Sequence, residues 1–183
     1  MPTTFPKALI KLIRGAYSGE KAAAYAYQGH ARSITSAEEK NWIKKIEDEE
    51  WDHRKYLKEM MQEYGLRPSL WLEIKMALIG QIISLACHLI GYFMPMYFAG
   101  RLESGNVEEY LEMKRLFNSI DIHQHDKCLE EMAAVEKEHE LYFLSKVEDH
   151  PWLKFFMKIF KWGPGLSFND YQLENKRIKN QNF

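Results

Sequence analysis

Hydrophobic and polar residues recur along this chain with the spacing of amphipathic helices, and the first two predicted helices have clear ends. Residues 6–33 form an Ala-rich segment of helical periodicity that stops near Ser33. The run Ser36-Ala-Glu-Glu39 is a capping box, with the serine as N-cap and the last glutamate as the third helical residue. It predicts a second helix that reaches about Tyr64 and ends at Gly65-Leu-Arg-Pro68.

The middle of the chain is more apolar than a surface helix requires. Residues 70–101 are mostly apolar, and we expect Gly80, Gly91 and Pro95 to break this segment. The chain then continues as a helix over 102–116. This stretch therefore predicts an additional apolar hairpin beside the regular helices.

Two further segments complete the pattern. After a polar turn near Asn118, a long helix is predicted to reach about Val147, and Pro151 ends it. Residues 152–162 form a short basic and aromatic segment. The polar tail 166–183 is expected to be loosely ordered.

Composition supports a single all-α domain over residues 1–183. A chain of 183 residues fits one domain with a full hydrophobic core. Glycine and proline are sparse and strand-like alternation is hard to find, so we expect a helical bundle over about 6–148. The formal net charge of −1 argues against a nucleic-acid binder, which normally shows a basic excess.

The candidate chemistry lies in two Glu-x-x-His pairs, each on a long predicted helix and each preceded by one isolated glutamate a helix earlier. Positions i and i+3 lie on one helix face, so each pair presents a carboxylate and an imidazole to one point. Two such pairs plus two single glutamates form the di-iron site of ferritin-like four-helix bundles, in which four carboxylates neutralise two Fe²⁺ ions. The predicted iron ligands are Glu20, Glu50, His53, Glu103, Glu136 and His139.

Other interpretations of these residues stay open on the pattern alone. Chance supplies Glu-x-x-His pairs in a chain with seven histidines. The same regions carry further acidic residues, so all of them could be solvated charges on helix faces: Glu47, Glu49, Asp52, Glu138 and Glu140. Glu103 has competitors in Glu108, Glu109 and Glu112. His88 is an alternative ligand, although a lone histidine in an apolar stretch is more often a core residue.

Several stretches resemble one known family in the order in which they occur. They are Ile10-Lys-Leu-Ile-Arg14 with Ser18-Gly-Glu20 and Tyr27-Gln-Gly29, then Asp48-Glu-Glu-Trp-Asp-His53 with Leu66-Arg-Pro68 and Leu70-Trp71, and finally Glu136-Lys-Glu-His139. Over about residues 8–148 the chain is thus similar to the demethoxyubiquinone hydroxylases, the di-iron monooxygenases of ubiquinone biosynthesis. The resemblance implies two iron ions, O₂ as co-substrate and an unidentified electron donor.

The resemblance also implies individual roles and shows departures. Counted on from Arg67, the family's third ligand falls at or next to Glu103, and its conserved tyrosine falls on Tyr110, our candidate catalytic residue. The family has an acidic residue before its first Gly-Glu, where this chain has Ala16-Tyr17-Ser18, and an Asp after its last histidine ligand, where this chain has Leu141. Carboxylates behind metal-bound histidines orient them, so these changes indicate a divergent member.

A membrane surface is the expected partner of the apolar middle. Glu73, Lys75 and the Gly/Pro positions count against a membrane-spanning helix in 70–101, so a hairpin lying at the bilayer surface fits better. Segment 152–162 combines aromatic residues with lysines and suits anionic interfaces. Core packing or a contact between subunits of a homo-oligomer is the alternative for both segments.

The sequence therefore predicts an enzyme, an O₂-dependent di-iron hydroxylase that acts on a membrane-derived, demethoxyubiquinone-like quinone. A ferritin-like iron- or peroxide-handling protein is the alternative, as is a hydroxylase of another apolar substrate. Cys87 and Cys128 lack CxxC spacing and are expected to be free thiols. The N-terminus lacks the apolar core of a signal peptide, so we expect cytoplasmic residence at the inner face of the membrane.

Overall fold

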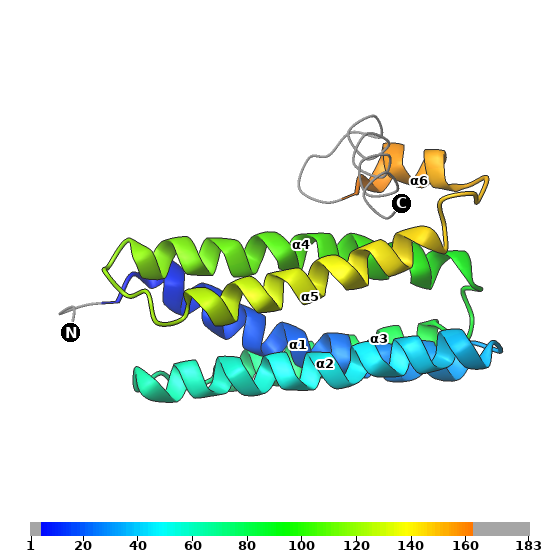
Figure 1. The fold of residues 1–183 in the computed structure, drawn as a ribbon. Helices are drawn as coiled ribbons and strands as arrows, with labels where there is room; N and C mark the ends of the chain where they lie inside the picture. The colour runs from blue at the N-terminus through cyan, green and yellow to red at the C-terminus, as the bar shows by residue number, and fades with distance from the viewer. Residues whose placement is uncertain (1–4, 163–183) are drawn as a thin grey trace.

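The computed structural model describes residues 5–162, and the regular elements in that range are helices, which confirms the all-α prediction. Four long helices form two antiparallel pairs, α1 with α2 and α4 with α5, which lie one over the other (Figure 1). The bounds are α1 Lys7–Ser33, α2 Ala37–Glu63, α3 Leu70–Ala86, α4 Phe93–Asn118, α5 Asp126–Ser145 and α6 Leu153–Phe160. The predicted tail 166–183 lies outside the described residues, and the single domain over 1–183 stays a prediction.

The predicted start of α2 is confirmed, but only half of the capping box forms. The Ser36 side chain accepts a hydrogen bond from the backbone N–H of Glu39 at 3.4 Å. The Glu39 carboxylate does not return to Ser36. It accepts instead from the Tyr92 hydroxyl at 2.8 Å and lies 3.3 Å from the Lys146 ammonium. The capping glutamate thus ties the start of α2 to the turn before α4.

The predicted breaks at Gly80 and Pro95 are wrong, and the break at Gly91 is confirmed. Helix α3 runs through Gly80, and α4 runs from Phe93 without interruption past the expected junction at residue 101. Pro95 lies in the first turn of α4, where its missing N–H costs no helical hydrogen bond. The chain turns over 87–92, where Gly91 has a φ of 76°.

Glycines in α1 and α3 serve the close approach of these two helices. A Cβ on Gly80 would lie 2.5 Å from the Ala22 carbonyl oxygen, and one on Gly29 would lie 2.4 Å from the Ser84 Cα. Glu73 anchors the other end of α3, because its carboxylate accepts from Arg54 Nη2 at 2.5 Å and from Ser18 Oγ at 2.8 Å. Helix α3 is therefore fixed on α1 while its outer face stays exposed.

The hydrophobic core has two halves with a polar layer between them. One half gathers around Ile43, Tyr97 and Phe143, and the other around Leu57 and Phe117. Along α2 and α5 the predicted ligands fall between the residues of the two halves. Cys87 and Cys128 are free, as predicted. Within residues 5–162 no helix combines the length and the apolar character needed to cross a membrane.

Candidate metal centre

The structure brings all six predicted ligands together in the middle of the bundle. They form two groups of side chains, each able to offer ligand atoms within 4.8 Å of one another. Both groups contain Glu50 from α2 and Glu136 from α5. The first group adds Glu20 and His53, and the second adds Glu103 and His139. This division suits two neighbouring cations with two shared carboxylates, and iron binding itself stays a prediction.

Burial distinguishes these residues from solvated charges. Each of the six has at most 4% of its surface exposed. Buried polar atoms are almost always hydrogen-bonded, yet several atoms of this cluster are buried without a hydrogen-bond partner: Glu20 Oε2, both carboxylate oxygens of Glu50, Glu136 Oε1, His53 Nδ1 and His139 Nδ1. Such atoms are the ones a metal ion would take, so this donor set fits a dinuclear carboxylate and histidine site.

Three polar side chains hold the single glutamates. The Tyr110 hydroxyl donates to Glu20 Oε1, and the Tyr27 hydroxyl donates to Glu103 Oε1. The Asn106 amide donates to Glu103 Oε2 at 2.8 Å. Each of the two single glutamates is thus oriented by a buried tyrosine. Tyr110 lies where the family resemblance placed it, and its catalytic role stays a prediction.

The two histidines turn one ring nitrogen toward the shared carboxylates. His53 Nδ1 lies 2.9 Å from Glu136 Oε1, and His139 Nδ1 lies 3.5 Å from Glu50 Oε1. On its other side, His139 Nε2 lies 2.9 Å from Glu49 Oε2. A carboxylate therefore stands behind His139 although Leu141 replaces the expected aspartate. Ser18 belongs to the second stretch that departs from the family, before Gly19-Glu20, and its hydroxyl donates to Glu73 of α3.

The buried carboxyls of the cluster lie close together in a low dielectric, which disfavours their ionised forms. Burial raises the pKa of Glu20, and burial together with the charge of Glu136 raises the pKa values of Glu50 and Glu103 well above their usual range. Burial opposes ionisation of Glu136 too, but the neighbouring imidazoles of His139 and His53 hold its pKa below the ordinary value. Bound metal cations would stabilise the ionised forms of Glu20, Glu50 and Glu103 and so lower their pKa values again.

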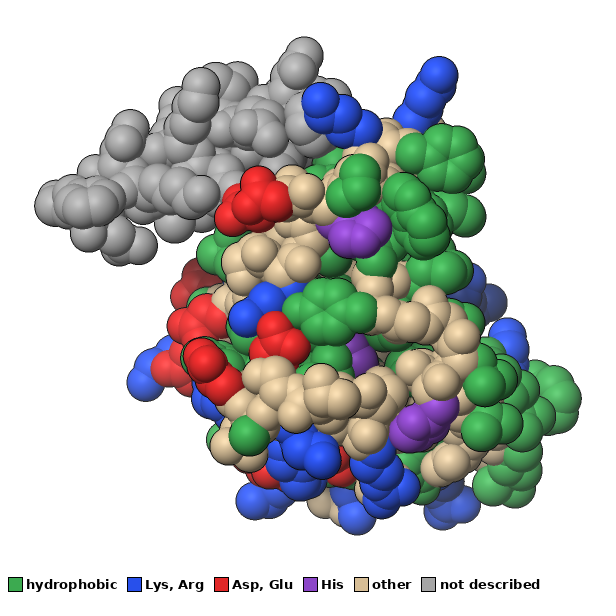
Figure 2. Space-filling view, turned by 90° about the vertical axis from the view of Figure 1, so that its right-hand side faces the viewer, with side chains coloured by type: hydrophobic (Ala, Val, Ile, Leu, Met, Phe, Trp, Pro, Cys, Tyr) green, Lys and Arg blue, Asp and Glu red, His purple; other side chains and the backbone are tan. Residues whose placement is uncertain are grey.

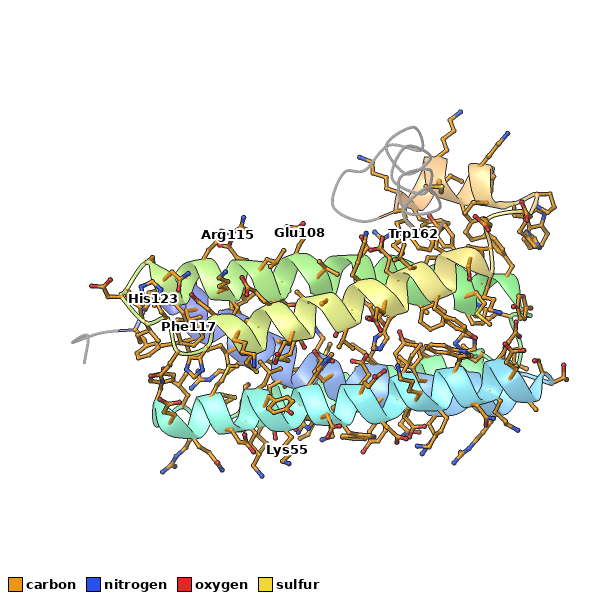
Figure 3. All side chains as sticks on the ribbon, viewed as in Figure 1. Lys55, Glu108, Arg115, Phe117, His123 and Trp162 are labelled. Atoms are coloured by element: carbon orange, nitrogen blue, oxygen red, sulfur yellow. The ribbon has the colours of Figure 1, made fainter. Side chains whose placement is uncertain are left out.

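The alternative ligands do not join the cluster. His88 is exposed and lines a different cavity, beside Thr35 and Tyr92. Glu108 is exposed and points away from the bundle, as Lys55 does on α2 (Figure 3). Two of the neighbouring acids are buried but have other partners. Glu47 lies 3.2 Å from Lys44 Nζ, and Glu140 accepts from the Trp162 indole N–H at 2.8 Å.

Two apolar cavities adjoin the candidate centre in the groove between α1, α3 and α4. The smaller, of about 150 Å³, is lined by Met76 and Ile79 of α3 and reaches Glu20. The larger, of about 350 Å³, is lined by Tyr27 and by the chain around the turn after α3. Ile83 and Leu102 line both cavities, so the two lie side by side. Glu109 also lines the smaller cavity, and burial raises its pKa to about 7.

Sequence reasoning missed several residues that surround the ligands. Tyr27 lies seven residues after Glu20 and Asn106 three after Glu103, so helical periodicity places each on the face of a ligand. That spacing could have predicted both. Glu49 gave no such indication, because it follows Asp48 and precedes Glu50 in a run of acids. Its partner is on α5, which only the packing of the helices reveals.

Comparison with known proteins places the chain in a family. The model of the family described as ubiquinone biosynthesis protein COQ7 matches residues 7–140, which include all six candidate ligands. The chain belongs to the COQ7 family. The predicted resemblance to the demethoxyubiquinone hydroxylases is thereby confirmed. Helix α6 follows the matched residues and lies outside the part that the COQ7 family model describes.

One curated relative shares a short segment. Over 59 residues the chain is 39% identical to the 3-demethoxyubiquinol 3-hydroxylase of Francisella philomiragia. The segment covers 32% of this chain and 28% of the relative, so the match spans less than a third of either protein. No solved structure matches the chain significantly.

Proposed function

We propose that this chain is an O₂-dependent di-iron hydroxylase of a quinone-type ring, built on a ferritin-like four-helix bundle. The observation that carries the proposal is the buried cluster of two histidines and four glutamates, whose ligand atoms converge in two groups and of which all but Glu103 have atoms without a hydrogen-bond partner. The COQ7 family match supports the reaction class, and the name of the Francisella relative, a 3-demethoxyubiquinol 3-hydroxylase, supports hydroxylation of a demethoxyubiquinone-like compound.

The residues would divide the work of holding two iron ions. Glu50 and Glu136 belong to both ligand groups and are the candidates for carboxylates shared by the two ions. The coordination of one ion would be completed by Glu20 and His53, and that of the other by Glu103 and His139. Bound iron would supply the reduction of O₂, which the side chains of a protein cannot perform. The tyrosines on Glu20 and Glu103 keep these carboxylates in place.

The cavities support an apolar substrate. The smaller cavity exposes Glu20 to a space lined mainly by Met76, Ile79 and neighbouring apolar side chains, so a ring placed there would lie beside the candidate centre. The larger one continues the groove and suits an apolar chain. Hydroxylation replaces a ring C–H by C–OH. The second oxygen atom leaves as water with two electrons and two protons, and the electron donor is unidentified.

The outer face of α3 supports docking on a membrane. Trp71 is 72% exposed and Leu78 is 61% exposed, and Leu70, Ile74 and Ile82 lie more than half exposed on the same helix. In Figure 2 apolar side chains gather along the right-hand side, both low down over the end of α3 and at the top over α6. We propose that this surface rests on the inner face of the membrane and admits the substrate between α3 and α4.

Vesicle binding tests the membrane part of the proposal. The variant Trp71→Gln/Leu78→Gln changes two exposed residues of α3 and removes apolar surface without touching the core. We expect it to lose sedimentation with phospholipid vesicles, whereas Lys55→Gln, exposed on α2, should sediment like the wild type. Equal sedimentation of all three proteins would contradict docking through α3.

Iron content and product analysis test the reaction. The purified protein should hold two irons per chain and, with O₂ and a reductant, add one oxygen atom to a short-chain quinone that lacks one ring methoxy group. The Glu50→Gln variant should lose both properties. Two irons without a hydroxylated product would refute the hydroxylase and favour an iron- or peroxide-handling protein. Absence of bound iron would refute both.

A further inference from the structure

His139 is the only candidate ligand in residues 5–162 whose imidazole lies between the cluster and a carboxylate outside it. Its Nδ1 lies 3.5 Å from Glu50 Oε1 and 3.7 Å from Glu136 Oε2. Its Nε2 lies 2.9 Å from Glu49 Oε2. The two ring nitrogens therefore meet different surroundings, with one in the cluster and the other on Glu49.

Glu49 is itself fixed by its surroundings. It precedes Glu50 on α2, and its side chain keeps 27% of its surface exposed. While Oε2 meets His139, Oε1 lies 3.1 Å from Lys45 Nζ one turn earlier on the same helix. Both oxygens thus have a cationic or N–H partner. Glu49 is absent from both groups of candidate ligands, which leaves it free to act on the histidine.

The chemistry of imidazole gives this contact a direction. A neutral imidazole carries one N–H donor and one acceptor nitrogen, and the hydrogen bond at one nitrogen decides which tautomer is present. A carboxylate can only accept, so the proton belongs on Nε2 and the lone pair on Nδ1. Nδ1 is the nitrogen that is buried without a hydrogen-bond partner among the carboxylates.

We propose that Glu49 is the positioning residue of His139, holding the imidazole so that Nδ1 is presented to a metal ion. It supplies from α2 the carboxylate that Leu141 cannot supply from α5. The inference rests on the proposed di-iron site and adds to it a role for a residue outside the ligand set.

The two histidines then differ. The Nδ1 atom of His53 lies 2.9 Å from Glu136 Oε1. In the described part of the chain, His53 Nε2 has no hydrogen-bond partner that corresponds to Glu49 at His139. An imidazole without a fixed second partner is less strictly oriented. The two metal positions are therefore inequivalent, and Glu49 acts on the position that contains Glu103 and His139.

Titration of the metal-free full chain with Co²⁺ tests the role of Glu49 without relying on activity. Glu49→Leu removes the acceptor, and we expect one of the two Co²⁺ binding steps to weaken by about 10- to 100-fold while the other stays unchanged. Glu49→Gln keeps an amide oxygen that accepts from Nε2–H and should restore most of the affinity. Asp52→Asn removes a charge from the same part of α2 at an exposed position and should leave both steps unchanged.

Nitrogen NMR of the Zn²⁺-loaded protein provides the second measurement. The wild type should show His139 metal-bound through Nδ1 and protonated at Nε2. Coordination through Nε2, or Glu49→Leu binding Co²⁺ as tightly as Asp52→Asn, would overturn the inference and leave the di-iron site intact. Failure of the wild type to bind any Co²⁺ would overturn the inference together with the proposed function.

Discussion

Hydrogen-bond donors beside the candidate ligands hold the carboxylates in the orientation that a metal ion would require. Tyr110 donates to Glu20 and is almost fully buried, and burial with the charge of Glu20 raises its pKa well above 10. The hydroxyl therefore keeps its proton and remains a donor at neutral pH. Tyr27 gives Glu103 the same support.

Replacing Tyr110 by phenylalanine should separate metal binding from folding. Loss of its hydroxyl frees the Glu20 carboxylate, so we expect affinity for Co²⁺ to fall by about 10-fold. Tyr97→Phe is the matched control, because the Tyr97 hydroxyl donates to the Lys161 carbonyl at 2.8 Å rather than to a candidate ligand, and Tyr97 lies in the other half of the core. Both variants should lose about 1 kcal/mol of folding free energy. Equal Co²⁺ affinity of the two variants would contradict a role for Tyr110 at the site.

The raised pKa values of the buried carboxyls make metal binding pH-dependent. Burial raises the pKa values of Glu20, Glu50 and Glu103 above 4.5, so the metal-free protein retains protons on these groups that a metal ion must displace. Binding then releases protons and strengthens as pH rises toward these raised values. The increase in melting temperature caused by Zn²⁺ should therefore be larger at pH of about 8 than at about 5. An increase that does not change with pH would contradict the assigned ligands.

Helical spacing in the sequence was enough to predict which side chains the fold brings together, and their role as iron ligands stays a prediction. Each Glu-x-x-His pair is a local pattern on one helix, the single glutamates were predicted from their place one helix earlier, and the packing of the helices brings them together. Glu49 could not be predicted, because the identity of its partner depends on which faces of α2 and α5 meet. Leu141 stands where the family has an aspartate behind its last histidine ligand, and the fold places the Glu49 carboxylate of α2 beside His139.

At the scale of elements, the packing of α3 on α1 was the feature that sequence reasoning misjudged. The glycines and the proline in 70–101 predict breaks, but both residue types are compatible with a helix where the context suits them. Gly80 is required by the approach of Ala22, and Pro95 occupies a first helical turn. Local sequence does not show such contacts between distant segments.

Filling the α1–α3 contact should destabilise the fold. An alanine at Gly29 would place its Cβ 2.4 Å from the Ser84 Cα, so the helices must separate, and we expect Gly29→Ala to cost about 1–3 kcal/mol. Gly105 on α4 has open space around the corresponding Cβ position, so Gly105→Ala should stabilise by about 0.4–1 kcal/mol. Urea denaturation measures both. A stabilising effect of Gly29→Ala would show that α3 does not pack as described.

At the scale of the whole molecule, the sequence predicted the helical bundle and the composition of its polar centre, and the structure added the spaces around it. Two core halves enclose the six side chains, and two neighbouring apolar cavities lie between α1, α3 and α4, the smaller of them reaching Glu20. Cavities arise from the fit of three helices, which no local pattern encodes. The family match, the buried donors and the apolar groove all favour one chemistry, oxidation of a hydrophobic molecule beside two metal ions.

The most direct test of this account is anomalous X-ray scattering at the iron edge from crystals of the iron-loaded protein. Two iron peaks should lie in the bundle, one contacted by Glu20 and His53 and the other by Glu103 and His139, with Glu50 and Glu136 between them. A single peak, peaks elsewhere on the molecule, or no anomalous signal after loading would contradict the di-iron centre.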